Sequence, residues 1–288
     1  SRYGLIAMAS SIDTVGPFSR NVTDAAELMN IIAGPDSADA TSQNKLVPNY
    51  VTELNKSVSN LRVGIPKEFF ADGLDVPVAK AVRQAIDVLT RLGARVTEVS
   101  LPSMPYALAV YYIMVPAEVS ANMARFDGLR FGDQVEANNL LNTYCRTRGE
   151  LLGAEVKRRI MLGTYVLSAG YYEAYYKQAQ IVRQQIKQDF ARVFEEVDVL
   201  ATPTTPTVAW PFGSKVDPLS MYMADIYTAP VNMAGVPGIS LPCGMVGGLP
   251  VGLQLIGRAW EDEVVLRLGY AYEQATEWHK QQPKILGF

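Results

Sequence analysis

The sequence predicts an α/β protein in which helices cover a mixed β-sheet on both faces and a helical insertion separates the sheet-forming parts. Three observations support this. Two short apolar runs, 238–241 and 251–256, are bordered by Gly and Pro and joined by 245–250, a pattern typical of buried strands with a tight connection. A strand–helix–strand order lies between 61 and 101. The stretch from about 106 to 197 is largely helical in composition.

The first predicted helix begins at Thr23 and Asp24. Asp24 and Glu27 have the spacing of a capping box, and Gly34 ends the helix. Apolar residues recur along it at helical spacing, which gives it one face suited to packing against a sheet.

Next comes the strand–helix–strand part. We expect a strand at Leu61–Ile65, a helix that begins at Pro77 and ends at Gly93, and a second strand at Val96–Leu101. Alternation of this kind is typical of an α/β layer.

The predicted insertion spans about 106–197. Its first helix covers Tyr106–Arg125, where Pro116 is expected to kink or divide it. Polar sequence follows up to about Gly153. Two further helices are expected at Ala154–Ser168 and Tyr171–Val197, the second with an amphipathic face.

The remaining elements complete the sheet. A strand is expected at Val197–Ala201 and a last helix at Asp262–His279. Gln254 interrupts the apolar run 251–256, so it needs a hydrogen-bond partner if it is buried. Leu253 and Leu255 leave that run little solvent-facing surface, which favours helices on both sides.

Composition excludes several classes of function. The formal charge of −3 provides no basic footprint for nucleic acid, and no apolar run approaches the roughly 20 residues of a membrane helix. Two distant cysteines favour a reducing cytoplasm, and a single histidine excludes a histidine-rich metal site, so we expect no metal in this chain.

Few side chains have the setting of a nucleophile. Ser10 and Ser11 have no histidine or lysine beside them, so a polar turn is the favoured interpretation. Cys243 has no basic neighbour in sequence and is interpreted as a small buried hydrophobe, and Cys145 as equally dispensable.

Charges in apolar surroundings are more informative. Among 157–159, which reads Lys-Arg-Arg, at least one cation is expected to point inward, and Asp225 lies between apolar and aromatic residues. Two interpretations stay open: structural ion pairs, or a site for an α-amino acid. In the second, Arg159 would bind the carboxylate as a bidentate fork and Asp225 the ammonium group.

Longer blocks resemble a known family. The stretches 1–36 (SRYGLIAMASSIDTVGPFSR…) and 232–258 (NMAGVPGISLPCG…GLPVGLQLIGR) are similar to the amidase signature family. The blocks FDGLRFG and EVKRRIMLGTYVLSAGYY resemble, within that family, the A subunits of glutamyl-tRNA(Gln) and aspartyl-tRNA(Asn) amidotransferases. The resemblance covers nearly the whole chain and implies the amidase signature fold.

The resemblance also implies an activity. Its members hydrolyse an amide with a Ser–Ser–Lys triad in Gly- and Ser-rich motifs. No Gly-Gly-Ser-Ser-Gly-Gly run occurs here, so we expect residues 1–288 to be the C-terminal part of one amidase domain, with the triad before residue 1 and no catalytic residue in the chain. Tyr111, Arg159 and Asp225 match the family's glutamine-binding residues.

The resemblance further implies partners in a three-subunit enzyme. In such enzymes the A subunit releases ammonia from glutamine, the B subunit uses ATP, magnesium and the tRNA to form Gln-tRNA(Gln), and a small C subunit joins both; no membrane is expected. Two alternatives stay open: another amidase-signature hydrolase acting on a small amide, or a non-catalytic scaffold that only docks partner proteins.

Overall fold

The protein forms two compact units in a computed structural model that describes residues 1–215 and 217–283. The sheet unit consists of Ser1, Val15–Leu108 and Gln185–Phe288, and the helical unit of Arg2–Thr14 and Ala109–Gln184. The early segment 2–14 therefore belongs with helices that follow it by about a hundred residues, which the sequence did not suggest.

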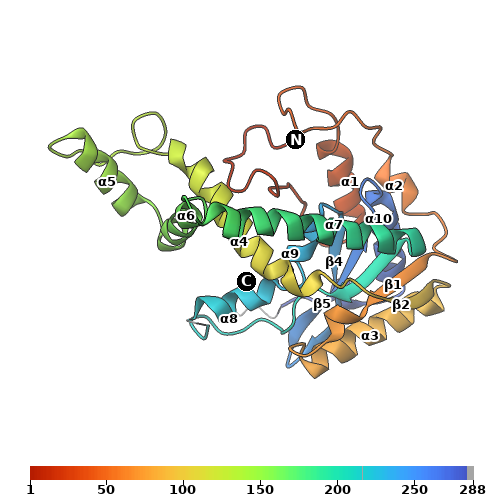
Figure 1. The fold of residues 1–288 in the computed structure, drawn as a ribbon. Helices are drawn as coiled ribbons and strands as arrows, with labels where there is room; N and C mark the ends of the chain where they lie inside the picture. Colours follow the sequence, from red (N-terminus) through yellow and green to blue (C-terminus); the bar gives the residue numbers. More distant parts are fainter. Residues whose placement is uncertain (216, 284–288) are drawn as a thin grey trace. The chain divides into compact units, whose positions relative to one another are not determined.

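Five strands form one mixed sheet in the order β2-β1-β3-β5-β4 (Figure 1). Their bounds are β1 Arg62–Pro66, β2 Arg95–Val99, β3 Val199–Pro203, β4 Gly238–Val246 and β5 Leu249–Gly257. β1 pairs in parallel with β2 and β3, whereas β5 pairs antiparallel with β3 and β4. The predicted mixed sheet is confirmed: each strand starts within two residues of its expected start, and β4 continues five residues beyond the apolar run expected for it.

The hairpin of β4 and β5 is tighter than its apolar runs suggest. Val246 pairs with Leu249, so only Gly247 and Gly248 form the turn. Their φ angles are 58° and 81°. Two consecutive positive φ values are those of a two-residue turn that matches strand twist, and glycine adopts them without a Cβ clash.

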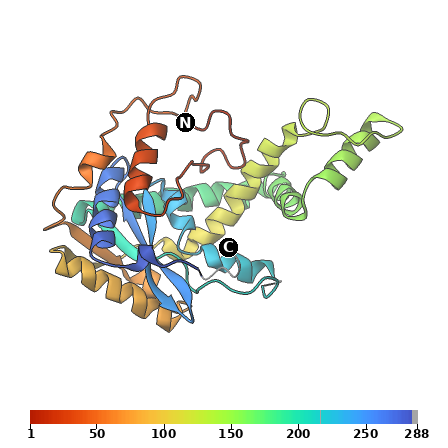
Figure 2. The ribbon, with the colours of Figure 1, turned by 180° about the vertical axis from the view of Figure 1, so that it is seen from behind.

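One face of the sheet packs against helices of the sheet unit. The alternation places Val199, Ala201 and Leu255 on this face, each fully buried in the main hydrophobic cluster. The helices that contribute to the cluster are α1 Val22–Ile32, α2 Tyr50–Glu53, α3 Val76–Arg91 and α10 Asp262–Gln274. Figure 2 shows them from behind, with α1 and α10 beside the blue strands.

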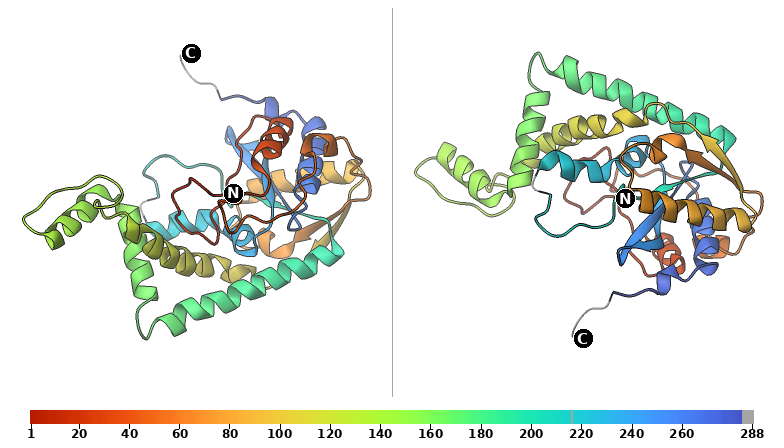
Figure 3. Two further views of the ribbon diagram at one scale, coloured as in Figure 1. Left: turned by 90° about the horizontal axis from the view of Figure 1, so that it is seen from above. Right: turned by 90° about the horizontal axis from the view of Figure 1, so that it is seen from below.

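The opposite face carries the alternate residues. Leu200 and Ile256 are fully buried there, and the second half of helix α7 (Gln178–Glu196) lies along this side of the sheet (Figure 3). Phe190 and Phe194 on that half are also almost fully buried. Helices thus cover both faces, as the sequence predicted.

Gln254 lies among these buried residues with only 6% of its surface exposed. Its Nε2 donates hydrogen bonds to Thr202 Oγ1 at 3.0 Å and to the Tyr227 carbonyl at 3.1 Å. The hydrogen-bond partner that the sequence required for Gln254 is therefore present, because the buried side-chain amide donates to residues of two other chain segments.

Replacing Gln254 by leucine is expected to destabilise the fold by about 1–3 kcal/mol, because the Thr202 hydroxyl and the Tyr227 carbonyl lose a buried partner. Urea denaturation of the protein and its variants measures the difference. Changing Thr202 to valine as well should recover part of the loss. A double variant no more stable than the sum of the single changes would show that the lost bonds are not the cause.

The helical unit contains the predicted insertion. Its helices are α4 Ala107–Asn122, α5 Leu140–Leu151, α6 Ala154–Val166 and the π-helix Tyr172–Lys177 that leads into α7. Of the two effects expected of Pro116, a division of the first helix is wrong, because α4 continues through it as one 16-residue helix, and a kink stays a prediction. Proline removes only one donor, and the rest of α4 retains its intrahelical bonds.

The stretch expected to be only polar sequence, up to Gly153, contains helix α5. Asn139 caps it by accepting from the Asn142 N–H at 2.9 Å. Before it, the Asp127 carboxylate accepts the Leu129 and Arg130 backbone N–H groups, which closes the FDGLRFG block into a turn. Polar composition hid this helix because its buried face consists of threonines rather than apolar side chains.

The start of α1 differs from the expected capping box. Asn21 is the N-cap: its side-chain oxygen accepts from the Asp24 N–H, and its side-chain Nδ2 donates to the Asp24 carboxylate. The pair has the spacing of a capping box but lies three residues earlier than Asp24–Glu27, and its second bond joins two side chains instead of reaching the Asn21 backbone N–H. In the part of the chain that the structure describes, the two remaining α-helices are α8 Pro218–Tyr222 and α9 Ala229–Ala234.

One expectation about membranes needs correction. The helical stretch Met104–Arg125 has 22 residues and a mean hydropathy of 1.2 in its 18-residue window, enough by length and composition to cross a bilayer. Interspersed small and polar residues hide it from a search for an unbroken apolar run. In this protein 44% of the window is buried, and one such helix is weak evidence of a membrane span, because core helices pass the same test of length and composition.

Candidate functional site

Helices α4 and α6 of the helical unit bring two predicted site residues together. Arg159 lies on α6 with 21% of its side chain exposed, against 48% for Arg158. Of the two arginines in the basic triplet, Arg159 is therefore the one turned inward. Its Nε donates to Glu155 Oε1 at 3.0 Å, and Arg158 pairs with the other oxygen of the same carboxylate.

The bond to Glu155 orients Arg159 through Nε and leaves its two terminal nitrogens to donate to a ligand. Glu155 engages only Nε, and among the described residues no side chain pairs with either terminal nitrogen. Burial disfavours the charged form, but the bond to Glu155 and the nearby Tyr111 and Tyr112 outweigh it and raise the pKa of Arg159. A protonated guanidinium with two free donors is suited to binding a carboxylate in bidentate fashion.

Tyr111 lies on α4 near this guanidinium. Its ring meets that of Tyr112 edge-on, with centroids 5.0 Å apart. It also packs, together with Ile160 of α6, against the buried cluster of Ala9, Val115 and Val119. The structure therefore places Tyr111 and Arg159 in one neighbourhood, as the sequence predicted.

Asp225, the third predicted residue, belongs to the sheet unit. It ends the short 3-10 helix Met223–Asp225 and is half-buried. Its backbone carbonyl accepts from the Thr228 N–H at 3.2 Å and hydroxyl at 3.3 Å, which fixes the turn that follows. Its role with a ligand stays a prediction that rests on its motif.

The Ser10–Ser11 turn has structural partners. The backbone N–H and hydroxyl of Ser11 donate to the Glu118 carboxylate, and Arg183 donates to the Ser11 hydroxyl at 2.8 Å. Asn122 donates to the Ser10 hydroxyl at 2.9 Å. Burial lowers the pKa of Arg183 although Glu118 lies close to it. These hydrogen bonds tie the Ser10–Ser11 turn to α4 and α7, which agrees with the polar turn favoured from the sequence.

The other candidate reactive side chains are two cysteines and one histidine. Cys145 and Cys243 are both free thiols, and burial raises the pKa of Cys243 to about 12, so it is not a thiolate at neutral pH. His279 lies in the 3-10 helix Trp278–Lys280. Within 1–215 and 217–283, no three His, Cys, Asp or Glu side chains gather in a way that could hold a metal ion.

A separate cavity of about 290 Å³ lies in the sheet unit, between 16–29, the start of β4 and α10. Its walls are mainly apolar, and burial raises the pKa of two carboxyl groups that line it, Asp262 and Glu273. Glu273 accepts from the Val22 N–H at 3.0 Å, which ties α10 to the start of α1. None of the predicted site residues lines this cavity.

Sequence reasoning missed the residues that hold the site. Glu155 was not singled out, yet it stands three and four residues before Arg158 and Arg159, the spacings at which helical side chains meet. Glu118 had no comparable signal, because its partner Ser11 is 107 residues away in sequence.

Comparisons with known proteins agree with the fold and the motifs. The family model described as Amidase matches residues 1–266. The chain is 54% identical over 286 residues to the A subunit of the glutamyl-tRNA(Gln) amidotransferase of Roseiflexus sp. (strain RS-1), and 55% identical over 287 residues to that of Carboxydothermus hydrogenoformans. Each alignment covers 99% of this chain, which spans 59% of the length of these relatives.

Solved structures show the same similarity. The A subunit of the Thermotoga maritima glutamyl-tRNA(Gln) amidotransferase is 40% identical, with a TM-score of 0.77 over 95% of this chain and 55% of that one. A bacterial aryl acylamidase of the amidase signature enzymes is 23% identical, with a TM-score of 0.72 over 92% of this chain and 53% of that one. The second likeness concerns the fold alone.

Proposed function

The chain belongs to the amidase signature family, and from this premise we propose that it is part of the glutamine-hydrolysing A subunit of a tRNA-dependent amidotransferase. In the proposed reaction, glutamine and water give glutamate and ammonia. The ammonia then serves to convert Glu-tRNA(Gln) to Gln-tRNA(Gln).

The observation that carries this proposal is the setting of Arg159. It is a half-buried guanidinium, oriented through Nε by Glu155 and flanked by Tyr111. We assign to it the α-carboxylate of glutamine, since a planar fork matches both carboxylate oxygens. Tyr111 would add a hydroxyl as donor or acceptor for the same ligand.

We assign the α-ammonium group of glutamine to Asp225. The support is the similarity of its YMADIYT motif to the A subunits, together with the relatives' names. A carboxylate is the natural partner of an ammonium ion. Together, Arg159 and Asp225 would make the site selective for an amino acid over a simple amide. A general amide hydrolase has no need of either charge.

We further propose two partner proteins, the B and C subunits of the amidotransferase. The B subunit would bind ATP, magnesium and the tRNA, and the C subunit would join the other two, with cytoplasm or organellar matrix as the location. Co-purification of the complete A subunit with both partners, and glutamine-dependent formation of Gln-tRNA(Gln) by that assembly, tests the proposal. Hydrolysis of small amides at comparable rates, with no dependence on either partner, would support another amidase instead.

The 288-residue chain by itself is expected to release no glutamate from glutamine above a buffer blank. Its sequence contains no Gly-Gly-Ser-Ser-Gly-Gly run, and Ser11, the serine with the most partners in the helical unit, is hydrogen-bonded to Glu118 and Arg183 rather than to a lysine. Without an activated hydroxyl no acyl-enzyme forms. A coupled glutamate dehydrogenase assay measures the release.

The complete A subunit in the same assay is the positive control. Glutamate release by the 288 residues alone, in a preparation free of other glutaminases, would mean that a nucleophile of a different kind lies within them. In that case alanine at Ser10, Ser11 and Cys243 in turn would identify it.

A further inference from the structure

We propose that Gly163 is a positioning residue for Arg159, because its missing side chain lets α6 lie close enough to α4 to keep Arg159 beside Tyr111. This inference rests on the proposed function, in which Arg159 binds the carboxylate of glutamine. It adds a residue that itself touches no ligand.

The two helix backbones come very close at Gly163. A Cβ atom added there would lie 1.8 Å from the Pro116 carbonyl oxygen, 2.4 Å from the Pro116 carbonyl carbon and 2.9 Å from the Ala117 nitrogen. Real Cβ atoms essentially never approach other heavy atoms within 3.0 Å. All three neighbours are backbone atoms of α4, so no side-chain rotation can relieve the contact.

Glycine is needed at 163 for space and not for backbone conformation. Gly163 lies inside α6, is buried, and is not among the residues with positive φ. Any larger residue could adopt its dihedral angles, and only the Pro116 backbone stands in the way. Adding a methyl group therefore has to push α6 away from α4.

Arg159 lies one turn from this contact, because it precedes Gly163 by four residues and shares its helix face. On α4, the residue four before Pro116 is Tyr112, whose ring meets that of the site residue Tyr111 edge-on. Ile160 of α6 packs on the same cluster as Tyr111. A shift of α6 at Gly163 thus moves Arg159 relative to Tyr111, while its bond to Glu155 on the same helix is kept.

A second glycine in the same unit provides a matched control. Gly149 lies inside α5, also without a positive φ, and a Cβ added there would meet no atom within 4 Å. Gly149→Ala introduces the same methyl group into a helix without a clash.

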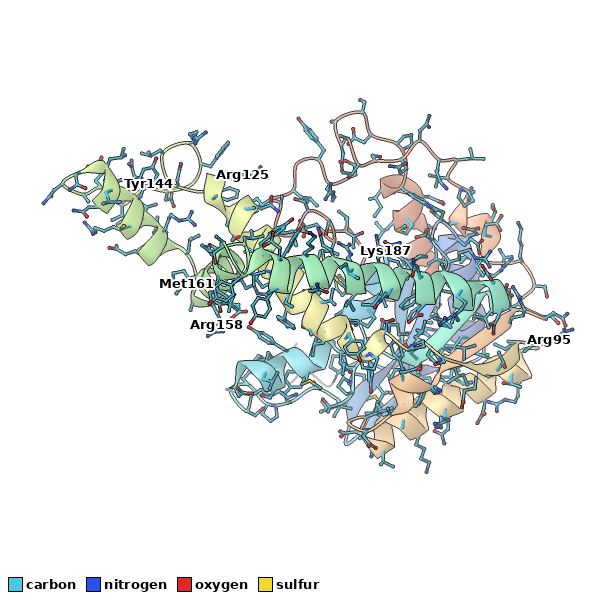
Figure 4. All side chains as sticks on the ribbon, viewed as in Figure 1. Arg95, Arg125, Tyr144, Arg158, Met161 and Lys187 are labelled. Carbon is cyan, nitrogen blue, oxygen red and sulfur yellow. The ribbon has the colours of Figure 1, made fainter. Side chains whose placement is uncertain are left out.

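Arg158 and Met161 lie on the exposed side of α6, which is the side turned away from the contact between Gly163 and Pro116 (Figure 4).

The experiment compares Gly163→Ala, Gly149→Ala and Arg159→Ala in the complete amidotransferase. Gly163→Ala is expected to raise the KM for glutamine roughly ten- to hundredfold, because a displacement of about 1 Å of a binding group has effects of that size. Formation of Gln-tRNA(Gln) from ammonia, and assembly with the partner proteins, should stay unchanged. Gly149→Ala should match the unmodified enzyme in every assay.

The double variant Gly163→Ala/Arg159→Ala separates positioning from general packing. If Gly163 acts through Arg159, adding the methyl group should change little once Arg159 is absent, because coupled residues are not additive. Additive effects, equal loss of the ammonia reaction, or failure of Gly163→Ala to assemble would each overturn the inference. If instead Arg159→Ala leaves the KM for glutamine unchanged, the proposed function itself fails.

Discussion

Replacing Arg159 by alanine in the complete amidotransferase is expected to lower glutamine-dependent formation of Gln-tRNA(Gln) by roughly 30-fold or more. The guanidinium is half-buried, and in the proposed site truncating it would leave the glutamine carboxylate desolvated without a partner, a loss of about 2–5 kcal/mol. Free ammonia enters after glutamine hydrolysis, so the ammonia-dependent reaction should be retained. Both reactions are measured side by side on the same preparation.

The neighbouring arginine is the matched control. Arg158 pairs with the same Glu155 carboxylate but is more than twice as exposed, so Arg158→Ala is expected to leave both reactions nearly unchanged. Arg159→Lys should restore activity only in part, because a point charge replaces a planar fork. Equal loss of both reactions in Arg159→Ala would show that the residue supports the fold or the assembly and not the ligand.

The sheet could be predicted from the sequence because local pattern decides it. The apolar runs that became β1, β3 and β5 are short, end at Gly or Pro, and contain few polar residues. A strand that is buried on both faces needs apolar residues at almost every position, so its sequence is easy to recognise. Their pairing order could not be predicted, since β3 lies between β1 and β5 through contacts distant in sequence.

The helical unit was less predictable. Its helix α5 buries Thr143 and Thr147, which hydrogen-bond the backbone at Ala137 and Val135 instead of forming an apolar stripe. The periodicity rule recognises only apolar stripes. The assignment of 2–14 to this unit depends on side-chain bonds to α4 and α7, and no local pattern marks them.

In the candidate site, too, the features set by local sequence could be predicted, and those set by contacts between helices could not. The basic triplet indicated an inward cation, but spacing alone could not choose between Arg158 and Arg159, and their burial now distinguishes them. The close contact of Gly163 with Pro116 had no signal, because a glycine inside a helical pattern predicts only a small loss of helix propensity. The need for glycine at 163 comes from its packing against another helix, which the local sequence does not encode.

Replacing Asp225 by alanine or asparagine in the complete enzyme is expected to lower glutamine-dependent activity by roughly 30-fold or more, again with ammonia-dependent activity retained. The reason is the α-ammonium group of glutamine, which would lose its only assigned counter-charge, a loss of about 2–5 kcal/mol. Asparagine keeps the size and the acceptor oxygen but not the charge. The asparagine variant should therefore resemble the alanine variant if charge is what the ligand requires.

Asp217 supplies the control in the same segment. Its carboxylate caps α8 by accepting from the Ser220 N–H at 2.8 Å, so Asp217→Ala removes a carboxylate and a local bond but no assigned ligand contact. A lost cap of this kind costs about 1 kcal/mol of stability and should affect both reactions equally and slightly. Deaminated analogues of glutamine, which lack the ammonium group, give the complementary measurement: they should bind Asp225→Asn at least as well as they bind the unmodified enzyme. If Asp225→Asn still prefers glutamine over such analogues as strongly as the unmodified enzyme does, Asp225 lies outside the ligand site.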